Sequence, residues 1–152
     1  MDLHFRPMRL HSRIQETPDT FTQNFVPLDG KPFVNRPGQF TVVKVGDTGV
    51  CRPYTVSSTH GISEFVTTTV CRVPGGCASN WITTVPVGST VYLADPMGDF
   101  TCDDDPMEKF LLMASGSGIT PILSMTRWLL VNKPRVDIEV VYTSFSGTGG
   151  GS

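Results

Sequence analysis

Residues 52–58, with the sequence Arg-Pro-Tyr-Thr-Val-Ser-Ser, combine a guanidinium, a phenol and three aliphatic hydroxyls in one short stretch. Pro53 fixes the backbone between Arg52 and Tyr54, and β-branched Thr55 favours an extended chain. Arg52 and Tyr54 then project from one face, where a bidentate phosphate donor stands beside a flat aromatic surface. A phosphorylated, planar ligand such as a flavin nucleotide would suit this face, although an ordinary strand with a surface arginine has the same pattern.

Two glycine-rich segments could hold phosphate groups. The first, Gly-Gly-Cys-Ala-Ser at residues 75–79, leads into a short helix predicted over residues 79–84 with Ser79 as its N-cap. It suits a pyrophosphate, because glycine lets backbone amides converge and a helix N-terminus favours an anion, but it also fits a simple loop. The second, residues 116–121, resembles a dinucleotide loop at a strand-to-helix turn, with Pro121 replacing the usual third glycine.

The elements that must position these residues are short strands separated by glycine and proline turns. In the first strand Met8, Leu10 and Ile14 stand at alternate positions that would share one face, and in the second Phe21 and Phe25 share a face. Strands are predicted over residues 8–14, 21–26, 41–45, 52–58, 64–73 and 89–94. With a single short helix inserted late, this pattern predicts a small antiparallel barrel or sandwich.

The pattern changes after the acidic run Asp-Asp-Asp-Pro at residues 103–106, which is expected to be a solvated hinge. Residues 109–115 form a continuous apolar run, typical of a strand buried on both faces of a parallel sheet. Apolar residues then recur at helical spacing, with Thr120 expected as N-cap and Pro121 as the first helical residue. Residues 136–143 are again rich in strand formers, so the segment predicts one βαβ unit with a right-handed crossover.

We therefore predict a barrel domain over residues 1–105, a partial βαβ unit over 106–145 and a Gly/Ser linker over 146–152. A lone βαβ unit cannot cover both faces of its sheet, so the chain is expected to end inside its second domain. Leu111, Leu112 and Val140, which a complete domain would bury, would then be partly exposed. The exposed apolar surface would favour self-association or a partner chain that completes the sheet.

Composition excludes several classes of protein. The net charge of −2 gives no reason to expect nucleic acid or an anionic membrane as a partner. The longest apolar runs, residues 110–114 and 128–131, are far too short to span a membrane, and residues 1–10 lack the apolar core of a secretory signal. The four cysteines form no Cys-x-x-Cys pair and have no zinc-ligand spacing, which favours reduced thiols in the cytoplasm and no metal site. Cys77 is expected to be a small buried thiol.

Together and in this order, the motifs resemble the flavin-binding and nicotinamide-binding signatures of the ferredoxin–NADP reductase superfamily. Arg-Pro-Tyr-Thr-x-x-Ser at residues 52–58 resembles its flavin strand motif, and Pro-Gly-Gln-Phe at 37–40 its lead-in. Gly-x-x-Ser-x-Trp at 76–81 resembles its pyrophosphate loop, and Gly-x-Gly-x-Thr-Pro at 116–121 its nicotinamide-domain loop. The resemblance implies a Greek-key flavin-binding barrel followed by part of a nicotinamide-binding α/β domain.

Within that superfamily the sequence most resembles the NADH-dependent reductases of hybrid-cluster protein. Residues 15–19, 98–104 and 121–125 carry this narrower likeness, and the whole resemblance covers residues 8 to about 143. It implies FAD as cofactor, NADH as electron donor and a redox protein such as hybrid-cluster protein as acceptor. The residues leave FAD or FMN open, because Arg52 could serve either phosphate, and they leave NADH or NADPH and the identity of the acceptor open.

The resemblance also implies roles for single residues. Thr55 would be the catalytic residue, hydrogen-bonded to the flavin N5 edge where hydride arrives, with Tyr54 against the isoalloxazine and Thr120 near the nicotinamide. The cofactor-binding residues would be Arg52, Pro53, Tyr54, Thr55, Thr69, Val70, Arg72, Gly76, Cys77, Ala78, Ser79, Gly116, Gly118, Thr120 and Pro121.

Three functions remain open at this point. The sequence shows neither the rest of the nicotinamide domain nor a cysteine-rich iron–sulfur domain, so whether the chain is an enzyme is left undecided. The first function is the flavin-binding half of an NADH-dependent electron-transfer oxidoreductase. The second is a truncated or engineered flavin-binding module without catalysis, and the third is a structural barrel that binds no ligand.

Overall fold

The computed structural model describes residues 2–144, so the predicted linker at 146–152 and residue 145 lie outside the described residues. Six strands come first along the chain, with one short helix before the last of them. The elements are β1 (Phe5–Gln15), β2 (Thr20–Pro27), β3 (Phe40–Lys44), β4 (Cys51–Thr55), β5 (Val66–Cys71), α1 (Cys77–Ile82), β6 (Thr90–Ala94), β7 (Lys109–Ser115), the 3-10 turn η1 (Gly116–Gly118), α2 (Ile119–Asn132) and β8 (Asp137–Thr143).

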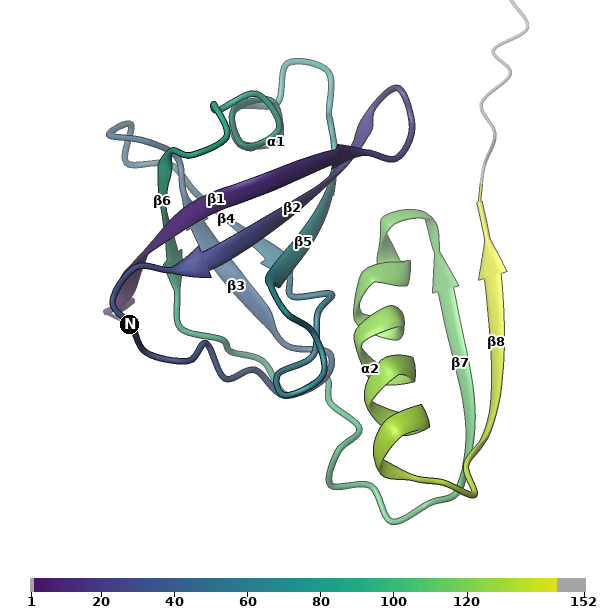
Figure 1. Cartoon of the computed structure of the whole chain (residues 1–152). Helices are drawn as coiled ribbons and strands as arrows, with labels where there is room; N and C mark the ends of the chain where they lie inside the picture. The colour runs from purple at the N-terminus through teal and green to yellow at the C-terminus, as the bar shows by residue number, and fades with distance from the viewer. Residues whose placement is uncertain (1, 145–152) are drawn as a thin grey trace, which may run out of the picture.

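Strands β1 to β6 form a single antiparallel sheet in the order β4-β3-β6-β1-β2-β5. Because β6 pairs with both β1 and β3, the chain crosses over in the Greek-key manner (Figure 1). The backbone N–H of Ser57, just after β4, donates to the Thr67 carbonyl of β5 at 2.9 Å, which joins the two ends of the sheet. The predicted antiparallel barrel with one short helix is confirmed.

The barrel interior is filled by alternate side chains of its strands. Phe21 and Phe25 of β2 are 7% and 0% exposed, which confirms that they share the inner face. Met8 and Leu10 of β1 are fully buried, but Ile14 is 50% exposed, so its predicted place on their face is wrong. The pairing of β1 with β2 shifts register between Leu10 and Ser12. Because of this irregularity, the even-numbered residues that follow point to the opposite face of the sheet.

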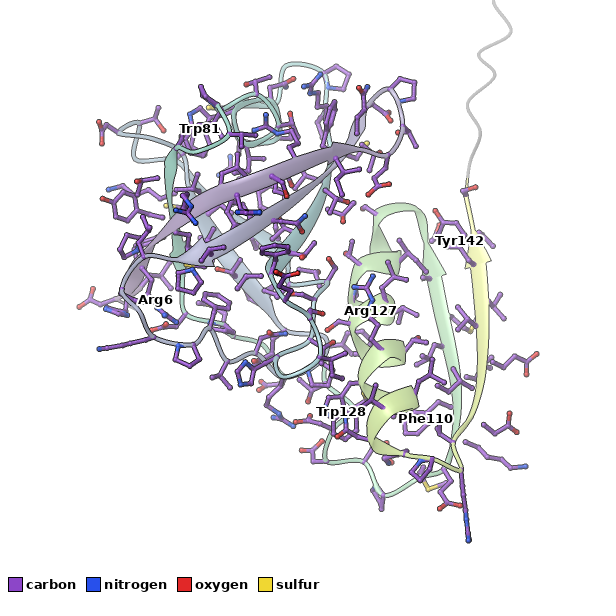
Figure 2. All side chains as sticks on the ribbon, in the orientation of Figure 1. Arg6, Trp81, Phe110, Arg127, Trp128 and Tyr142 are labelled. Carbon is purple, nitrogen blue, oxygen red and sulfur yellow. The ribbon has the colours of Figure 1, made fainter. Side chains whose placement is uncertain are left out.

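Strands β7 and β8 form a separate parallel pair, with α2 lying between this pair and the barrel (Figure 1). The inner face of β7 packs on α2: Leu112 is 8% exposed, and Phe110 lies between strand and helix (Figure 2). On the outer face Leu111 is 61% exposed and Met113 is 68% exposed, so β7 is buried on one face only. No helix among residues 2–144 is long and apolar enough to span a membrane.

Both helices begin two residues or more before the predicted starts, and glycine supplies the N-cap each time. Gly76 caps α1, while the Ser79 hydroxyl accepts the Val73 N–H at 3.1 Å. Gly118 caps α2, while the Thr120 hydroxyl donates to the Ser117 carbonyl at 3.0 Å. The predicted N-caps Ser79 and Thr120 are therefore wrong: glycine is itself an acceptable N-cap, and both hydroxyls bond elsewhere in the loop.

Candidate functional site

A cavity of about 900 Å³ opens where β4 and β5 of the barrel, the start of α1 and the turn before α2 come together. This volume is within the range of sites that hold a cofactor or substrate. Its lining comprises Arg52, Pro53, Tyr54, Thr55, Thr69, Val70, Cys71, Val73, Gly76, Cys77, Ala78, Ser79, Ser117, Gly118, Thr120 and Pro121. A smaller cavity of about 270 Å³, beside residues 58–66, contains none of the residues predicted to bind a ligand.

The large cavity brings together three segments that are far apart in the sequence. Every residue predicted to bind a cofactor lines it, except Arg72 and Gly116. The strand at residues 52–55, the loop at 76–79 and the turn at 118–121 therefore face one space. Residues 52–55 belong to β4 of the six-stranded sheet, whereas residues 118–121 follow β7 of the parallel pair. Both parts of the chain are therefore needed to form the cavity.

β4 sets the geometry of the first wall. Arg52 pairs with Val43 and Tyr54 pairs with Thr41 on β3, so the two side chains share one face of the strand. The exposed guanidinium of Arg52 donates to the Cys51 carbonyl at 2.8 Å, which leaves its remaining N–H groups available to a ligand.

Tyr54 gives this wall a flat apolar surface. Its side chain is partly buried and packs against the barrel core. Burial raises the pKa of Tyr54, and the charge of nearby Arg52 opposes the rise only in part. The phenol therefore stays protonated at neutral pH, which keeps the ring neutral and its hydroxyl able to donate a hydrogen bond.

Thr55 and the segment before β3 hold the end of β4. Thr55 pairs with Phe40, and the next residue, Val56, donates its N–H to the Gln39 carbonyl at 3.0 Å. On β5 the Thr69 hydroxyl is 2.9 Å from the Thr22 hydroxyl, so its hydrogen-bonding capacity is partly used within the barrel. Among residues 2–144 the Thr55 hydroxyl has no hydrogen-bond partner, which suits it to a ligand in the cavity that it lines.

The loop before α1 is folded too tightly for any residue but glycine at position 76. A Cβ there would lie 2.7 Å from the Ser79 hydroxyl and 3.0 Å from the Val73 carbonyl oxygen. The absence of a side chain lets the backbone from Gly76 to Ala78 approach the cavity directly. Backbone N–H groups at the start of a helix have no partner within it, so this loop can bind an anion.

Arg72 lies near the cavity but is used elsewhere. Its guanidinium stacks over Phe21 at 4.1 Å from the ring centre, and its Nε donates to the Thr83 hydroxyl at 2.7 Å. Gly116, with φ of +52°, shapes the turn before α2 without lining the cavity. The assignment of both residues to cofactor binding stays a prediction.

Three lining residues were missed by the sequence reasoning: Cys71, Val73 and Ser117. Ser117 stands between the two glycines of the loop motif and could have been found from that position. Cys71 and Val73 flank Arg72, the residue chosen in their place. Cys77 is exposed in the cavity, so the expectation of a buried thiol is wrong.

The arrangement suits an elongated ligand that carries phosphate groups and a planar ring. Arg52 and the backbone at Gly76 offer donors to anions, and Tyr54 with Thr55 offers a flat surface and a hydroxyl. The turn that carries Thr120 and Pro121 closes the opposite side, where a second ligand could meet the planar ring.

Similarity to known proteins was found at the level of both sequence and fold. The family model described as "Oxidoreductase FAD-binding domain" matches residues 7–102. The chain is 46% identical over 137 residues to NADH oxidoreductase HCR of Escherichia coli, covering 89% of this chain and 42% of that protein. It is 37% identical to a glycine betaine monooxygenase reductase subunit of Chromohalobacter salexigens, covering 86% of this chain and 36% of that protein. The chain thus spans less than half the length of either relative.

Two solved structures have the same fold over nearly the whole chain. Phthalate dioxygenase reductase, described as modular for electron transfer from pyridine nucleotides to 2Fe-2S, has a TM-score of 0.80 and 25% identity, covering 92% of this chain and 44% of that one. The ferredoxin reductase in carbazole 1,9a-dioxygenase has a TM-score of 0.83 and 21% identity, covering 95% and 44%. The second likeness bears on the fold alone.

Proposed function

We infer that this chain, which belongs to the oxidoreductase FAD-binding domain family, is the flavin-binding part of an NADH-dependent electron-transfer oxidoreductase. In this function a hydride passes from NADH to FAD, and electrons then pass to a redox protein. The observation that carries the proposal is the single cavity shared by residues 52–55, 76–79 and 117–121. These segments correspond to the predicted ring, phosphate and nicotinamide positions.

The residues present fit FAD. Arg52 supplies a guanidinium with free N–H groups for one phosphate, and the side-chain-free backbone at Gly76 gives the other phosphate close access. Tyr54, Thr69 and Val70 all line the cavity. The half-buried ring of Tyr54 would lie against the ribityl chain and isoalloxazine, and Thr69 and Val70 would offer backbone groups to the pyrimidine end. When bound, FAD supplies the hydride-accepting and electron-releasing chemistry, and the protein orients it.

Thr55 is the residue we assign to catalysis. Its hydroxyl would donate to the flavin N5 edge, and Thr120 across the cavity would keep the nicotinamide on that side. The protein contributes positioning, because hydride transfer requires the reacting atoms at about 3–3.5 Å. The apolar surfaces of Tyr54 and Pro121, which both line the cavity, would displace water from the contact.

The acceptor we propose is a redox protein in the cytoplasm. Relatives of the chain carry the names NADH oxidoreductase and monooxygenase reductase subunit, which is the basis for an acceptor of this class. Hybrid-cluster protein is the specific acceptor that the sequence resemblance favours, and an oxygenase component is the alternative.

Titration with FAD tests the proposal directly. The purified chain is expected to be yellow, or to quench the fluorescence of added FAD with one site per chain. Parallel titrations with FMN and riboflavin separate the phosphate contributions: FAD should bind more tightly than FMN, and FMN more tightly than riboflavin. A colourless protein that quenches none of the three would sink the flavin assignment and leave a structural barrel.

The second candidate function is a flavin-binding module without catalysis. The chain spans 42% of NADH oxidoreductase HCR, so the activity of the whole protein is a separate proposal from flavin binding. Stopped-flow mixing of the FAD-loaded chain with NADH separates the two functions. We expect FAD to bind but to be reduced slowly, because among the described residues the turn at 116–121 is the one segment predicted to contact the nicotinamide nucleotide. Rapid bleaching at micromolar NADH would show that this turn is sufficient.

A further inference from the structure

We propose that Ser124 and Arg127 of α2 are positioning residues, which set the separation between the two walls of the flavin cavity. The inference rests on the proposed function and deepens it. One wall is β4, which ends at Thr55, and the other is the turn into α2, which carries Thr120. The backbone just after β4 is bonded directly to the middle of α2, so the two walls are joined behind the cavity.

Ser124 makes the central contact. Its side chain is 0% exposed, and its hydroxyl donates to the Ser58 carbonyl at 3.0 Å. The Ser124 hydroxyl oxygen also accepts the Gly38 N–H at 3.4 Å, and the Thr59 hydroxyl donates to the Ser124 carbonyl at 3.1 Å. A helical serine that exchanges hydrogen bonds with two separate barrel segments fixes the helix in translation and in rotation.

Arg127 makes the second contact, one turn further along the helix. Its Nη1 donates to the Ser57 carbonyl at 2.7 Å, and Arg127 is labelled on α2 in Figure 2. Ser57 is a fixed anchor, because it is 2% exposed and its own N–H and hydroxyl both donate to the Thr67 carbonyl of β5. The charged group of Arg127 therefore bonds to a carbonyl that the barrel already holds in place.

The contacts are close enough to the cavity to control it. Thr120 precedes Ser124 by about one helical turn, a rise of about 6 Å at 1.5 Å per residue. Thr55 is the last residue of β4, and Ser57 follows it by two residues. Because a helix moves as a rigid rod, a shift at Ser124 is passed to Thr120, and the distance from Thr120 to Thr55 changes with it.

The opposite limit on movement comes from close packing at Gly38. A Cβ at this position would lie 2.2 Å from the Phe100 carbonyl oxygen and 2.6 Å from the Cε of Met125 on α2. Contact at Gly38 stops the helix from moving toward the barrel, and the bonds of Ser124 and Arg127 stop it from moving away. The separation is thereby fixed from both sides.

The test uses the FAD-loaded chain and two hydride donors. Reduced nicotinamide mononucleotide carries a phosphate that the turn at residues 116–121 is predicted to hold, whereas N-benzyl-1,4-dihydronicotinamide carries none. We define a ratio as the second-order rate constant for flavin reduction by the mononucleotide divided by that for the benzyl compound. This ratio reports how well the wall that carries Thr120 is positioned against the flavin. The flavin difference spectrum on binding oxidised nicotinamide mononucleotide gives a second readout that needs no turnover.

Four variants give the comparison. Ser124→Ala and Arg127→Met remove the two contacts, Arg127→Lys keeps a cationic donor, and Arg135→Met removes an exposed arginine beyond the end of α2 as the matched control. We expect the ratio to fall at least about 5-fold in Ser124→Ala and in Arg127→Met, the factor that corresponds to about 1 kcal/mol. Arg127→Lys should restore most of the ratio, and FAD affinity should change less than about 2-fold, because the residues that contact FAD are untouched.

The outcomes separate this inference from the proposed function. Wild-type chain that takes up no FAD overturns both. Wild-type chain that binds FAD but shows no preference for the mononucleotide overturns the inference alone, as does an unchanged ratio and difference spectrum in the folded variants. If Ser124→Ala lowers FAD affinity as much as it lowers the ratio, its role is structural and the inference is wrong. Arg127→Met, an exposed position, provides the same comparison if Ser124→Ala fails to fold.

Discussion

Arg52 supplies the only guanidinium among the residues that line the large cavity. We predict that Arg52→Ala weakens FAD binding more than Thr55→Ala does. A charge-assisted bond to phosphate contributes about 1.5–3 kcal/mol, whereas a bond from a neutral hydroxyl contributes about 0.5–1.5 kcal/mol. Fluorescence titration of both variants with FAD measures the difference, with Arg135→Ala as the control for loss of a surface charge. Equal losses of affinity in the two variants would count against the assignment.

The cysteines should differ in reactivity because of where they lie. Cys102 is 5% exposed, and burial raises its pKa to about 11, so little reactive thiolate is present at pH 8. Cys77 is exposed and lines the cavity. We predict that iodoacetamide labels Cys77 well before Cys102, and that saturating FAD slows labelling of Cys77 but not of Cys51, which does not line the cavity. Peptide mass spectrometry of a labelling time course measures both effects.

Two results would contradict this prediction. Labelling of Cys102 at the rate of Cys77 would mean that burial does not protect it in solution. If FAD slows the labelling of Cys51 and Cys77 equally, the effect would come from a general decrease in flexibility and not from FAD occupying the cavity.

At single positions, the sequence predicted which backbone segments meet but not every side chain that faces the ligand. Arg52 and Tyr54 were predictable because a two-residue spacing on a strand places them on one face. Arg72 has the same chemistry as Arg52, yet its guanidinium lies on Phe21 and Thr83. Those partners come from β2 and from the end of α1, and no local pattern around residue 72 indicates them.

At the scale of elements, the strand periods predicted the barrel, while the boundaries depended on details of the backbone. Ile14 changed face because of a register irregularity in β1, which a regular alternation cannot anticipate. The starts of α1 and α2 were missed because Gly76 and Gly118 act as N-caps, and the more usual capping residues Ser79 and Thr120 stand two or three positions later.

Gly38 connects β3, α2 and the segment before Cys102, so substitution there should affect several elements together. We predict that Gly38→Ala destabilises the chain by at least about 1–2 kcal/mol. The residue has φ of +98°, and a Cβ would collide with the Phe100 carbonyl. Chemical denaturation measures the free energy of unfolding. Gly49→Ala, with φ of +76° but open space around the Cβ, is the matched control. A loss no larger than that of the control would mean that the packing at Gly38 is unimportant.

An ion pair joins the segment before β3 to the acidic run after β6. The Arg36 guanidinium binds both oxygens of Asp103, with Nη2 to Oδ1 at 2.7 Å, and holds the pKa of Asp103 below its usual range. A carboxyl with a lowered folded-state pKa stabilises the protein above its unfolded pKa of about 3.9, and this stability is lost as pH falls through the folded value. Asp103→Asn should therefore cost stability at pH 6 and progressively less below about pH 4.

Urea unfolding of wild type and Asp103→Asn at pH 6 and at pH 3 measures this difference. Asp104→Asn is the control, because Asp104 is 77% exposed and its contribution should be small at both values. A cost of Asp103→Asn that is the same at pH 6 and pH 3 would show that the carboxylate charge is not responsible.

At the scale of the whole molecule, the barrel is closed, whereas the β7–β8 pair is open on one face. Leu111 pairs with Glu139 and Met113 pairs with Val141, so these four side chains share the outer face. Leu111, Met113 and Val141 are 61%, 68% and 39% exposed. Val140, on the face toward α2, is also 44% exposed, whereas Leu112 is buried. The predicted exposure is therefore confirmed for Leu111 and Val140 and wrong for Leu112.

An apolar sheet face next to an edge strand is a surface on which a second copy of the chain can pack or pair. We predict that the chain self-associates as its concentration rises, and that Leu111→Lys with Met113→Lys shifts it toward monomer, because two charges on a paired face repel their copies. Sedimentation velocity from low to high micromolar concentration measures the change.

Val34→Lys, at a 60% exposed position on the barrel side of the molecule, is the matched control. The control should leave the association unchanged, and FAD binding should survive in all three proteins, because no residue that lines the cavity belongs to β7 or β8. Wild-type chain that stays monomeric over the whole range would mean that the exposed residues of β7 and β8 are too few, or too interrupted by Glu139, to hold two copies together.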